Sequence, residues 1–267
     1  DNPALRLKLF QVEFLSTLAG NTLVTLVYHR RLEDDWHRAA TRLAADLDIV
    51  LEGRSRKQKW TIERDYVQET LQVNGRSYHY LQYEQAFTQP KATVNMHMLD
   101  WTFDKAQSLY GDLLELYCGN GTFSLPLAAH FDHVIATELS KSSVRAAREN
   151  IQANAASNIE VIRLSAEEAT QAMNGEREFR RLAKLPRPLG EYQLDTIFVD
   201  PPRAGLDQYT TAMAARFPTI LYISCNPTTL AENLKTLCNT HRIEHFAMFD
   251  QFPYTEHMEC GVMLRRR

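Results

Sequence analysis

The chain has 267 residues, of which 44% are hydrophobic and 24% charged, proportions that are ordinary for a globular protein of one or two domains. It contains no run of about 18 apolar residues, so we expect no membrane span. The formal net charge of −3 argues against an unselective polyanion binder, because such binding depends on neutralising phosphates.

The cysteines and the N-terminus indicate the compartment. Cys118, Cys225, Cys238 and Cys260 form no C-x-x-C pair, and the histidines are scattered, so we expect no metal site. The first residues have neither the basic start nor the apolar core of a signal peptide. We therefore expect reduced thiols and a cytoplasmic protein.

Residues 1–85 are predicted to form a small α+β region with antiparallel strands. Two β-rich runs, 8–18 and 22–29, flank a turn at Gly20, and a helix over 34–47 begins with Asp34 or Asp35 as its N-cap. Further strands are expected over 48–52 and 59–63. The pair Asn74-Gly75 predicts a tight hairpin between 70–73 and 77–81.

A basic cluster lies inside this region, from Arg54 through Arg56 and Lys57 to Lys59. Two interpretations remain open. The cluster can be a solvated strand edge that resists aggregation, or a local basic face for RNA.

Residues 86–267 are predicted to form a larger α/β domain. A helix over 92–108 is followed by alternating strands and helices, a pattern typical of a doubly wound parallel sheet. The last two strands have no helix between them, so one strand of the seven should run in reverse. The expected strands are 112–117, 133–138, 159–164, 194–200, 219–225, 243–249 and 260–264, and the expected helices between them are 122–130, 141–154, 166–173, 208–216 and 229–240.

The first strand of this domain leads into a turn that contains Gly119 and Gly121. Two glycines allow a ligand to approach the backbone closely, and the helix that follows offers free N–H groups. Glu138 ends the next strand, where a carboxylate can accept hydrogen bonds from both hydroxyls of a ribose. The alternative for Glu138 is a cap on the helix that begins at Ser140. Together these features favour a nucleoside cofactor without a pyrophosphate.

Reactive side chains follow two later strands. Asp200 precedes two prolines at one strand end, and Cys225 closes the next. In a parallel sheet both ends open onto one crevice. The segment 251–260 adds Glu256, His257 and Glu259 near this rim. A thiolate that adds to carbon 6 of a uracil makes carbon 5 nucleophilic, and a base then removes the carbon 5 proton.

Three motifs carry a family resemblance. "DPPRAGLD", "SCNP" and "FPYTEHMEC" resemble the RNA (uracil-5-)-methyltransferases, and "KLFQ" and "AFTQP" resemble the bacterial tRNA branch. The resemblance covers essentially the whole chain. It implies a class I, Rossmann-like methyltransferase domain that uses S-adenosylmethionine to methylate the T-loop uridine of tRNA, and possible action on other T-loop-like RNA. It also implies a monomer.

The resemblance assigns roles to individual residues. Cys225 is expected to be the nucleophile and Glu259 the base, whereas the cofactor site is expected to contain Gln89, Tyr117, Gly119, Gly121, Thr122, Glu138 and Asp200. Thr122 stands where this branch usually has Asn, which puts its cofactor role in doubt. The family also has a longer N-terminal stretch, so residues 1–85 are expected to be an incomplete RNA-binding region.

Other functions remain as alternatives. An rRNA uridine 5-methyltransferase is a close sibling, and a truncated RNA-binding module without catalysis is a different class. An amino-methyltransferase is disfavoured, because Arg203 replaces the aromatic residue that follows its Pro-Pro motif. Aromatic residues that could hold RNA, judged by type alone, are Phe10, Tyr28, Tyr78 and Tyr80.

Overall fold

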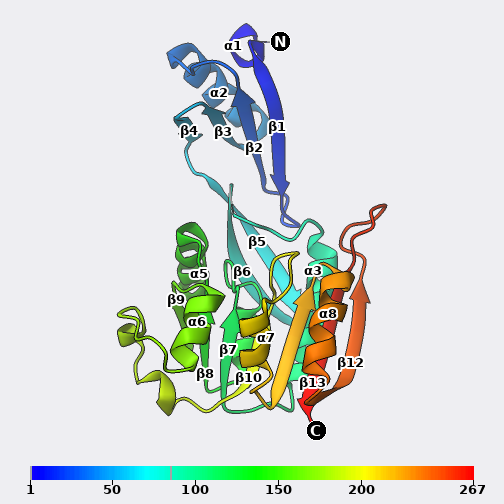
Figure 1. Ribbon diagram of the computed structural model, residues 1–267. Coiled ribbons are helices and arrows are strands. Elements are labelled where there is room, and N and C mark those ends of the chain that lie inside the picture. The colour runs from blue at the N-terminus through cyan, green and yellow to red at the C-terminus, as the bar shows by residue number, and fades with distance from the viewer. Residues whose placement is uncertain (1, 85) are drawn as a thin grey trace. The chain divides into compact units, whose positions relative to one another are not determined.

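The computed structural model describes residues 2–84 and 86–267, and the chain divides into two compact units (Figure 1). Unit 1 comprises Asp1–Leu71 and His79–Ala86, and unit 2 comprises Gln72–Tyr78 and Phe87–Arg267. The division passes through the hairpin formed by β5 (Tyr66–Val73) and β6 (Arg76–Tyr83), so that the tip of this hairpin belongs to unit 2.

Unit 1 is built on a four-stranded sheet in the order β1-β2-β3-β4, and one amphipathic helix packs against it. The helix α2 presents Trp36, Ala40 and Ala44 to the sheet, where these residues join the buried core. A Cβ on Gly53 would lie 2.3 Å from the Trp36 ring, so only glycine allows this close packing. The elements are α1 (Pro3–Arg6), β1 (Leu9–Ser16), β2 (Thr22–Tyr28), α2 (Asp34–Leu47), β3 (Val50–Ser55) and β4 (Gln58–Ile62).

Two local expectations for unit 1 were wrong. The strands β2 and β3 pair in parallel, because α2 lies between them as a crossover; the other neighbours in this sheet are antiparallel. The N-cap of α2 is Glu33, whose side chain makes no capping bond. Asp34 and Asp35 lie in the first turn instead, where their charge suits the positive end of the helix dipole.

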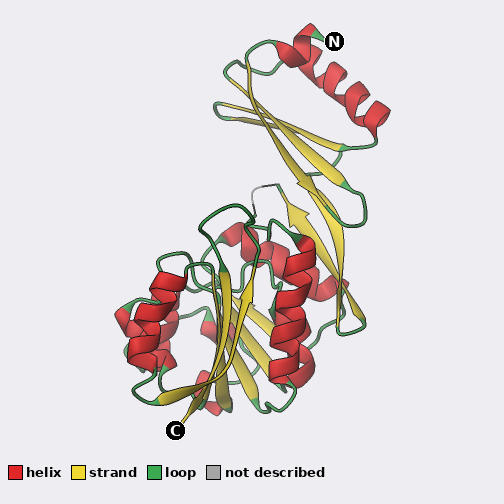
Figure 2. Ribbon diagram, turned by 90° about the vertical axis from the view of Figure 1, so that its right-hand side faces the viewer, coloured by secondary structure: helices red, strands yellow, loops and turns green. Residues whose placement is uncertain are grey.

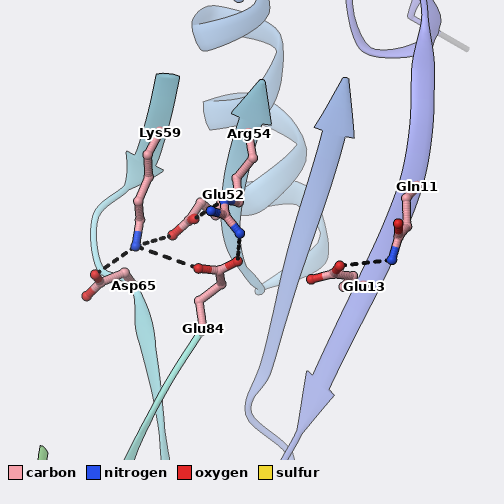
Figure 3. A network of polar contacts seen from close by, with 7 residues as sticks. All are labelled: Gln11, Glu13, Glu52, Arg54, Lys59, Asp65 and Glu84. Atoms are coloured by element: carbon pink, nitrogen blue, oxygen red, sulfur yellow. Dashed lines mark hydrogen bonds and ion pairs between the residues drawn. The ribbon is translucent and has the colours of Figure 1, made fainter. Parts of the chain in front are cut away.

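The basic cluster of unit 1 is partly occupied by internal ion pairs (Figure 3). Lys59 Nζ lies 3.0 Å from Glu52 and 3.1 Å from Asp65, and Arg54 Nη1 lies 3.1 Å from Glu84. The side chains of Glu52 and Glu84 are 0% and 2% exposed. Arg54 and Lys59 therefore compensate buried carboxylates, which neither of the two interpretations of this cluster foresaw.

Unit 2 contains the predicted seven-stranded sheet, in the order β12-β13-β11-β10-β7-β8-β9. The strand β13 is antiparallel to both of its neighbours, whereas the other pairs in this sheet are parallel, which confirms the predicted fold class. The strands are β7 (Asp112–Leu116), β8 (His133–Thr137), β9 (Ile159–Ile162), β10 (Leu194–Val199), β11 (Thr219–Ser224), β12 (His241–Phe249) and β13 (Glu259–Arg266).

Helices cover both faces of this sheet (Figure 2). On one face the core joins Leu114 and Leu116 of β7 to apolar residues of α6, α7 and α8. On the other face Phe123 packs against Phe198 of β10, with ring centroids 4.9 Å apart. The helices of unit 2 are α3 (Ala92–Ala106), α4 (Ser124–Leu127), α5 (Lys141–Ala153), α6 (Ala166–Met173), α7 (Gln208–Ala214) and α8 (Pro227–Leu237), with short 3₁₀ turns at Ala128–His130, Leu182–Lys184 and Leu189–Glu191.

The helix α3 clamps the C-terminal strands from the side. Trp101 of α3 contacts Gly261 of β13 so closely that a Cβ on this glycine would lie 2.8 Å from the indole. The same indole meets the ring of Phe249 edge to face. This packing holds the segment before α3 near the loop between β12 and β13. Within residues 2–84 and 86–267, no helix is long and apolar enough to cross a membrane.

Candidate active site

A cavity of about 700 Å³ opens in unit 2 at the carboxyl ends of the parallel strands. The predicted site residues that line it are Gln89, Tyr117, Gly119, Thr122, Glu138, Asp200, Cys225 and Glu259. Gly121 is the predicted residue that lies outside the lining. The position agrees with the rule that open α/β sheets bind ligands beyond their strand ends.

The turn after β7 has an unusual backbone. Tyr117, Gly119 and Gly121 have φ values of 61°, 56° and 83°, in the left-handed region. Glycine tolerates this region, whereas Tyr117 adopts it at a cost of about 1–3 kcal/mol, a pattern common at ligand sites. The Gly121 N–H donates to the Cys118 carbonyl at 2.8 Å. Gly121 therefore stabilises the turn without lining the cavity, whereas Gly119 lines it.

Glu138 follows β8 and joins two backbone segments. One carboxylate oxygen accepts from Gly119 N at 3.1 Å, and the other accepts from Ser140 N at 2.7 Å. Ser140 itself caps α5 through a bond from Ser143 N to its hydroxyl. Glu138 thus braces both the glycine turn and the start of this helix. Each oxygen keeps a free lone pair for a ligand hydroxyl in the cavity.

Thr122 lines the cavity as well, next to the glycine turn. Its hydroxyl donates to Oδ1 of Asn120 at 2.5 Å, and Asn120 is a further lining residue. The Asn120 backbone carbonyl accepts from Asn150 of α5 at 3.0 Å. Thr122 therefore orients a neighbouring amide, a role the sequence did not reveal.

Strand register brings Cys225 and Glu259 together. In the antiparallel pair of β11 and β13, Ser224 lies opposite Cys260. The next position places Cys225, just after β11, opposite Glu259, the first residue of β13. Glu259 is 2% exposed, and its Oε2 has no hydrogen-bond partner among the residues that the structure describes. A thiol and an unpartnered carboxylate thus face one cavity.

The helix α8 holds the loop after Asp200 in place. The Arg203 carbonyl accepts from the Asn226 amide at 3.0 Å and from the Thr229 hydroxyl at 3.1 Å. The Asn233 side chain accepts from Leu206 N and donates to the Leu206 carbonyl, both at 2.9 Å. The Asn233 side-chain oxygen also accepts from the Tyr222 hydroxyl of β11 at 2.8 Å. The loop after Asp200 and the strand β11, which Cys225 follows, therefore both bond to the same helix.

Burial dominates the electrostatics of the site. It raises the pKa of Glu259 to about 7. It raises the pKa of Asp200 well above its usual range, and Glu259 and Glu115 add repulsion. Burial, Glu259 and Asp200 also raise the pKa of the Cys225 thiol, although the Arg203 guanidinium opposes the shift. A carboxylate with a pKa near 7 suits proton removal at neutral pH.

Several lining residues had no predicted role. Arg203 and His257 lie against each other at the rim, and the His257 ring meets Phe252 edge to face. All three belong to the motifs "DPPRAGLD" and "FPYTEHMEC". The sequence signal that could have found them is their position in these motifs. Arg203 comes soon after β10, and Phe252 and His257 lie in the loop between β12 and β13.

The remaining candidates separate by exposure. Phe10 is 65% exposed on β1, whereas Tyr28, Tyr78 and Tyr80 are buried in the core, which rules them out as RNA contacts. Cys118 and Cys260 are also buried, and Cys238 ends α8. Among the described residues no cluster of three His, Cys, Asp or Glu side chains is placed to hold a metal ion.

Comparison with known proteins identifies relatives of this chain. The model of the tRNA (Uracil-5-)-methyltransferase family matches residues 1–267. Two relatives are named tRNA/tmRNA (uracil-C(5))-methyltransferase. That of Saccharophagus degradans is 54% identical over 98% of this chain and 72% of its own length, and that of Cronobacter sakazakii is 55% identical over 100% and 74%.

Solved structures share the fold. The tRNA (uracil-54, C5)-methyltransferase of Pyrococcus abyssi, in complex with S-adenosyl-L-homocysteine, aligns with a TM-score of 0.70 at 22% identity, over 95% of this chain and 59% of that one. A putative SAM-dependent methyltransferase of Streptococcus mutans aligns with a TM-score of 0.56 at 13% identity, over 97% and 76%. The resemblance inferred from the motifs is confirmed: the chain belongs to the tRNA (uracil-5-)-methyltransferase family.

Proposed function

We propose that this protein methylates carbon 5 of the T-loop uridine in tRNA through a covalent adduct with Cys225. The observation that carries this proposal is that Cys225 and Glu259 line the same cavity as the glycine turn and Glu138. The reaction needs these elements together: a thiol for carbon 6, a base for the carbon 5 proton, and a methyl donor beside them.

The cavity suits S-adenosylmethionine as the methyl donor. Glu138 offers lone pairs to the ribose hydroxyls, and the space around Gly119 is open, since a Cβ there would meet nothing within 4 Å. Tyr117, Gln89 and Thr122 would complete the cofactor wall, and Asp200 follows β10, which lies between the strand before Cys225 and the strand before the glycine turn. When bound, this cofactor supplies a methyl group on a positively charged sulfur. The carboxylates of the cavity favour that charge.

Cys225 begins the reaction on the uracil. Its thiolate adds to carbon 6, and the electron pair of the double bond moves onto the carbon 4 oxygen as an enolate. This pair makes carbon 5 the nucleophile that takes the methyl group. Cys225 lies just before Asn226, the N-cap of α8, and the N-terminus of this helix together with Arg203 favours the thiolate.

Glu259 completes the reaction. Its carboxylate removes the proton from carbon 5, the electron pair restores the ring double bond, and the bond from carbon 6 to sulfur breaks. The thiolate is then free for another cycle. The missing partner of Glu259 Oε2 is consistent with an oxygen that must accept a proton.

The substrate follows from the relatives and from the chemistry. Relatives are named for both tRNA and tmRNA, and we extend the proposal to other RNA that folds as a T-loop. The uridine must leave its stack to reach Cys225, as base-modifying enzymes require. We propose that residues 1–85 hold the RNA, with exposed Phe10 as one stacking surface. The free cysteines suit a reducing cytoplasm, and we propose that the protein acts there as a monomer.

A trapping experiment tests the proposal. The protein is mixed with S-adenosylmethionine and a T-loop RNA that carries 5-fluorouridine at the target, and its intact mass is measured under denaturing conditions. Fluorine cannot leave as a cation, so the methylated adduct should persist. Cys225→Ala should abolish the adduct, whereas Cys238→Ala should preserve it, because Cys238 does not line the cavity.

The same experiment separates the alternatives. An adduct with an rRNA hairpin in place of the T-loop would favour an rRNA enzyme. RNA binding without any adduct, unchanged by Cys225→Ala, would contradict the covalent mechanism and favour a binding module.

A further inference from the structure

Gln251 carries a buried amide that the proposed reaction does not use. It lies just after β12, is 1% exposed, and does not line the cavity. Its Nε2 donates to Oε1 of Gln89 at 2.9 Å, and Gln89 does line the cavity. A second bond, from Lys91 Nζ to the Asp250 carbonyl at 3.5 Å, joins the same two segments. The segment 87–91 and the loop 250–258 are therefore tied together here.

The direction of the amide–amide bond decides what Gln89 offers to a ligand. Since the side-chain oxygen of Gln89 accepts from Gln251, the group of Gln89 left for the cavity is its NH₂, which can only donate. The reverse arrangement would bury the Gln251 NH₂, with two donors, where a single carbonyl oxygen now lies without a partner among the described residues. The observed direction leaves that oxygen unpaired and directs the Gln251 NH₂ to Gln89, and the donor role of Gln89 follows from this direction.

We infer that Gln251 is a positioning residue that holds Gln89 as a hydrogen-bond donor toward an acceptor on the cofactor. The acceptor would be a carboxylate, a hydroxyl or a ring nitrogen of a nucleoside that carries an amino acid group. The inference rests on the proposed cofactor site. It also explains why the loop that contains His257 and leads to Glu259 is tied to the cofactor wall.

Calorimetric titration with S-adenosylhomocysteine tests this role without RNA. Gln89→Met should weaken binding about tenfold, because a hydrogen bond to the ligand is lost. Gln251→Met keeps the side-chain length but removes the donor, so Gln89 can turn; binding should weaken about threefold. The double variant should bind like Gln89→Met alone. Asp250→Ala is the matched control and should bind normally, since only its backbone carbonyl makes the contact.

Each outcome has a defined meaning. If Gln251→Met weakens binding by the same factor in the unmodified protein and in Gln89→Met, Gln251 has a structural role only and the inference is overturned. Unchanged binding in Gln251→Met would also overturn it. Should Gln251→Met lower the melting temperature severely, Gln251→Asn, whose shorter amide cannot reach Gln89, replaces it under the same criteria. Failure of the unmodified protein to bind S-adenosylhomocysteine would instead overturn the proposed cofactor site.

Discussion

Buried carboxylates occur in both units, but the two units differ in whether a cation lies beside them. In unit 1, Glu52 and Glu84 each lie beside a cation, Lys59 or Arg54 (Figure 3). In unit 2, Glu115 and Glu259 are buried as well, but no described cation is ion-paired with either, and the group beside Glu115 is the neutral Ser124 hydroxyl. Cations therefore compensate the buried carboxylates of unit 1, although burial still raises the pKa of Glu52 to about 7, as it does for Glu259.

The difference separates structure from chemistry. A buried ion pair fixes the packing of the elements that carry it, and removing one partner leaves an uncompensated charge. Burial raises the pKa of a carboxylate toward neutrality both beside a cation, as in Glu52, and without one, as in Glu259, so access to the cavity decides which of them can exchange a proton with a substrate. Glu259 borders the cavity, whereas Glu52 belongs to a sheet in unit 1, so burial alone does not mark a functional residue.

The largest effect is expected at Glu259. Glu259→Gln should reduce turnover about a thousandfold, because an amide cannot remove the carbon 5 proton. The methylated adduct on Cys225 should then accumulate with unmodified T-loop RNA, which mass spectrometry would detect. Glu256→Gln is the matched control in the same loop and should leave turnover unchanged, because Glu256 is exposed and outside the cavity lining. Normal turnover in Glu259→Gln would exclude it as the base.

The pH dependence of the unmodified protein sharpens this prediction. The pKa of Glu259 is about 7, and only its ionised form accepts a proton. Single-turnover rates should therefore fall about fiftyfold as the pH drops from about 7 to about 5, because the ionised fraction falls from about one half to about one hundredth. Rates that stay constant over this range would mean that another group removes the proton.

The paired carboxylate of unit 1 should respond to loss of its cation. Lys59→Met removes the ammonium 3.0 Å from Glu52. Because the Lys59 side chain is 40% exposed, we reduce the usual cost of breaking a buried pair and expect a loss of about 2 kcal/mol in the free energy of unfolding at neutral pH. Urea denaturation measures this loss. The double variant Lys59→Met/Glu52→Gln should recover most of it, and no recovery would show that Lys59 acts by packing alone.

The fold could be predicted largely from sequence, because its signals are local and periodic. Alternating strands and helices indicated the doubly wound sheet, and the lack of a helix between the last two strands indicated the reversed one. The parallel pairing of β2 with β3 was missed, because composition does not distinguish a crossover helix from one that merely covers a sheet.

The site could be predicted only in part, for a similar reason. Parallel strands end at one edge, so Asp200 and Cys225 could be placed together from their positions alone. The bond between Gln89 and Gln251 joins residues 162 positions apart, and the partners of Glu52 depend on side-chain directions in unit 1. Neither contact leaves a periodic or local signal in the sequence.

Glu115 offers a smaller test of the unpaired carboxylates. It is 1% exposed, and burial raises its pKa to about 8 from an ordinary 4.5. Between these values the folded protein holds the proton more tightly than the unfolded chain, so stability should fall as the pH rises. Glu115→Gln should remove this loss and raise the free energy of unfolding at about pH 9 by about 1 kcal/mol, since the new amide stays buried without partners. At about pH 4 the gain should vanish. A gain that is equal at both pH values would contradict ionisation as the cause.

The smallest effect is expected for a pair that is exposed rather than buried. On α8, Lys235 Nζ lies 2.7 Å from Glu232 Oε1, and the Glu232 and Lys235 side chains are 63% and 70% exposed. Glu232→Gln should change the free energy of unfolding by no more than a few tenths of a kcal/mol, because water and salt screen both charges. The same urea denaturation used for Lys59→Met measures it. A loss as large as that of Lys59→Met would mean that charge pairing, and not burial, sets the energetic scale in this protein; the contrast between the two sets of buried carboxylates would then lose its physical basis.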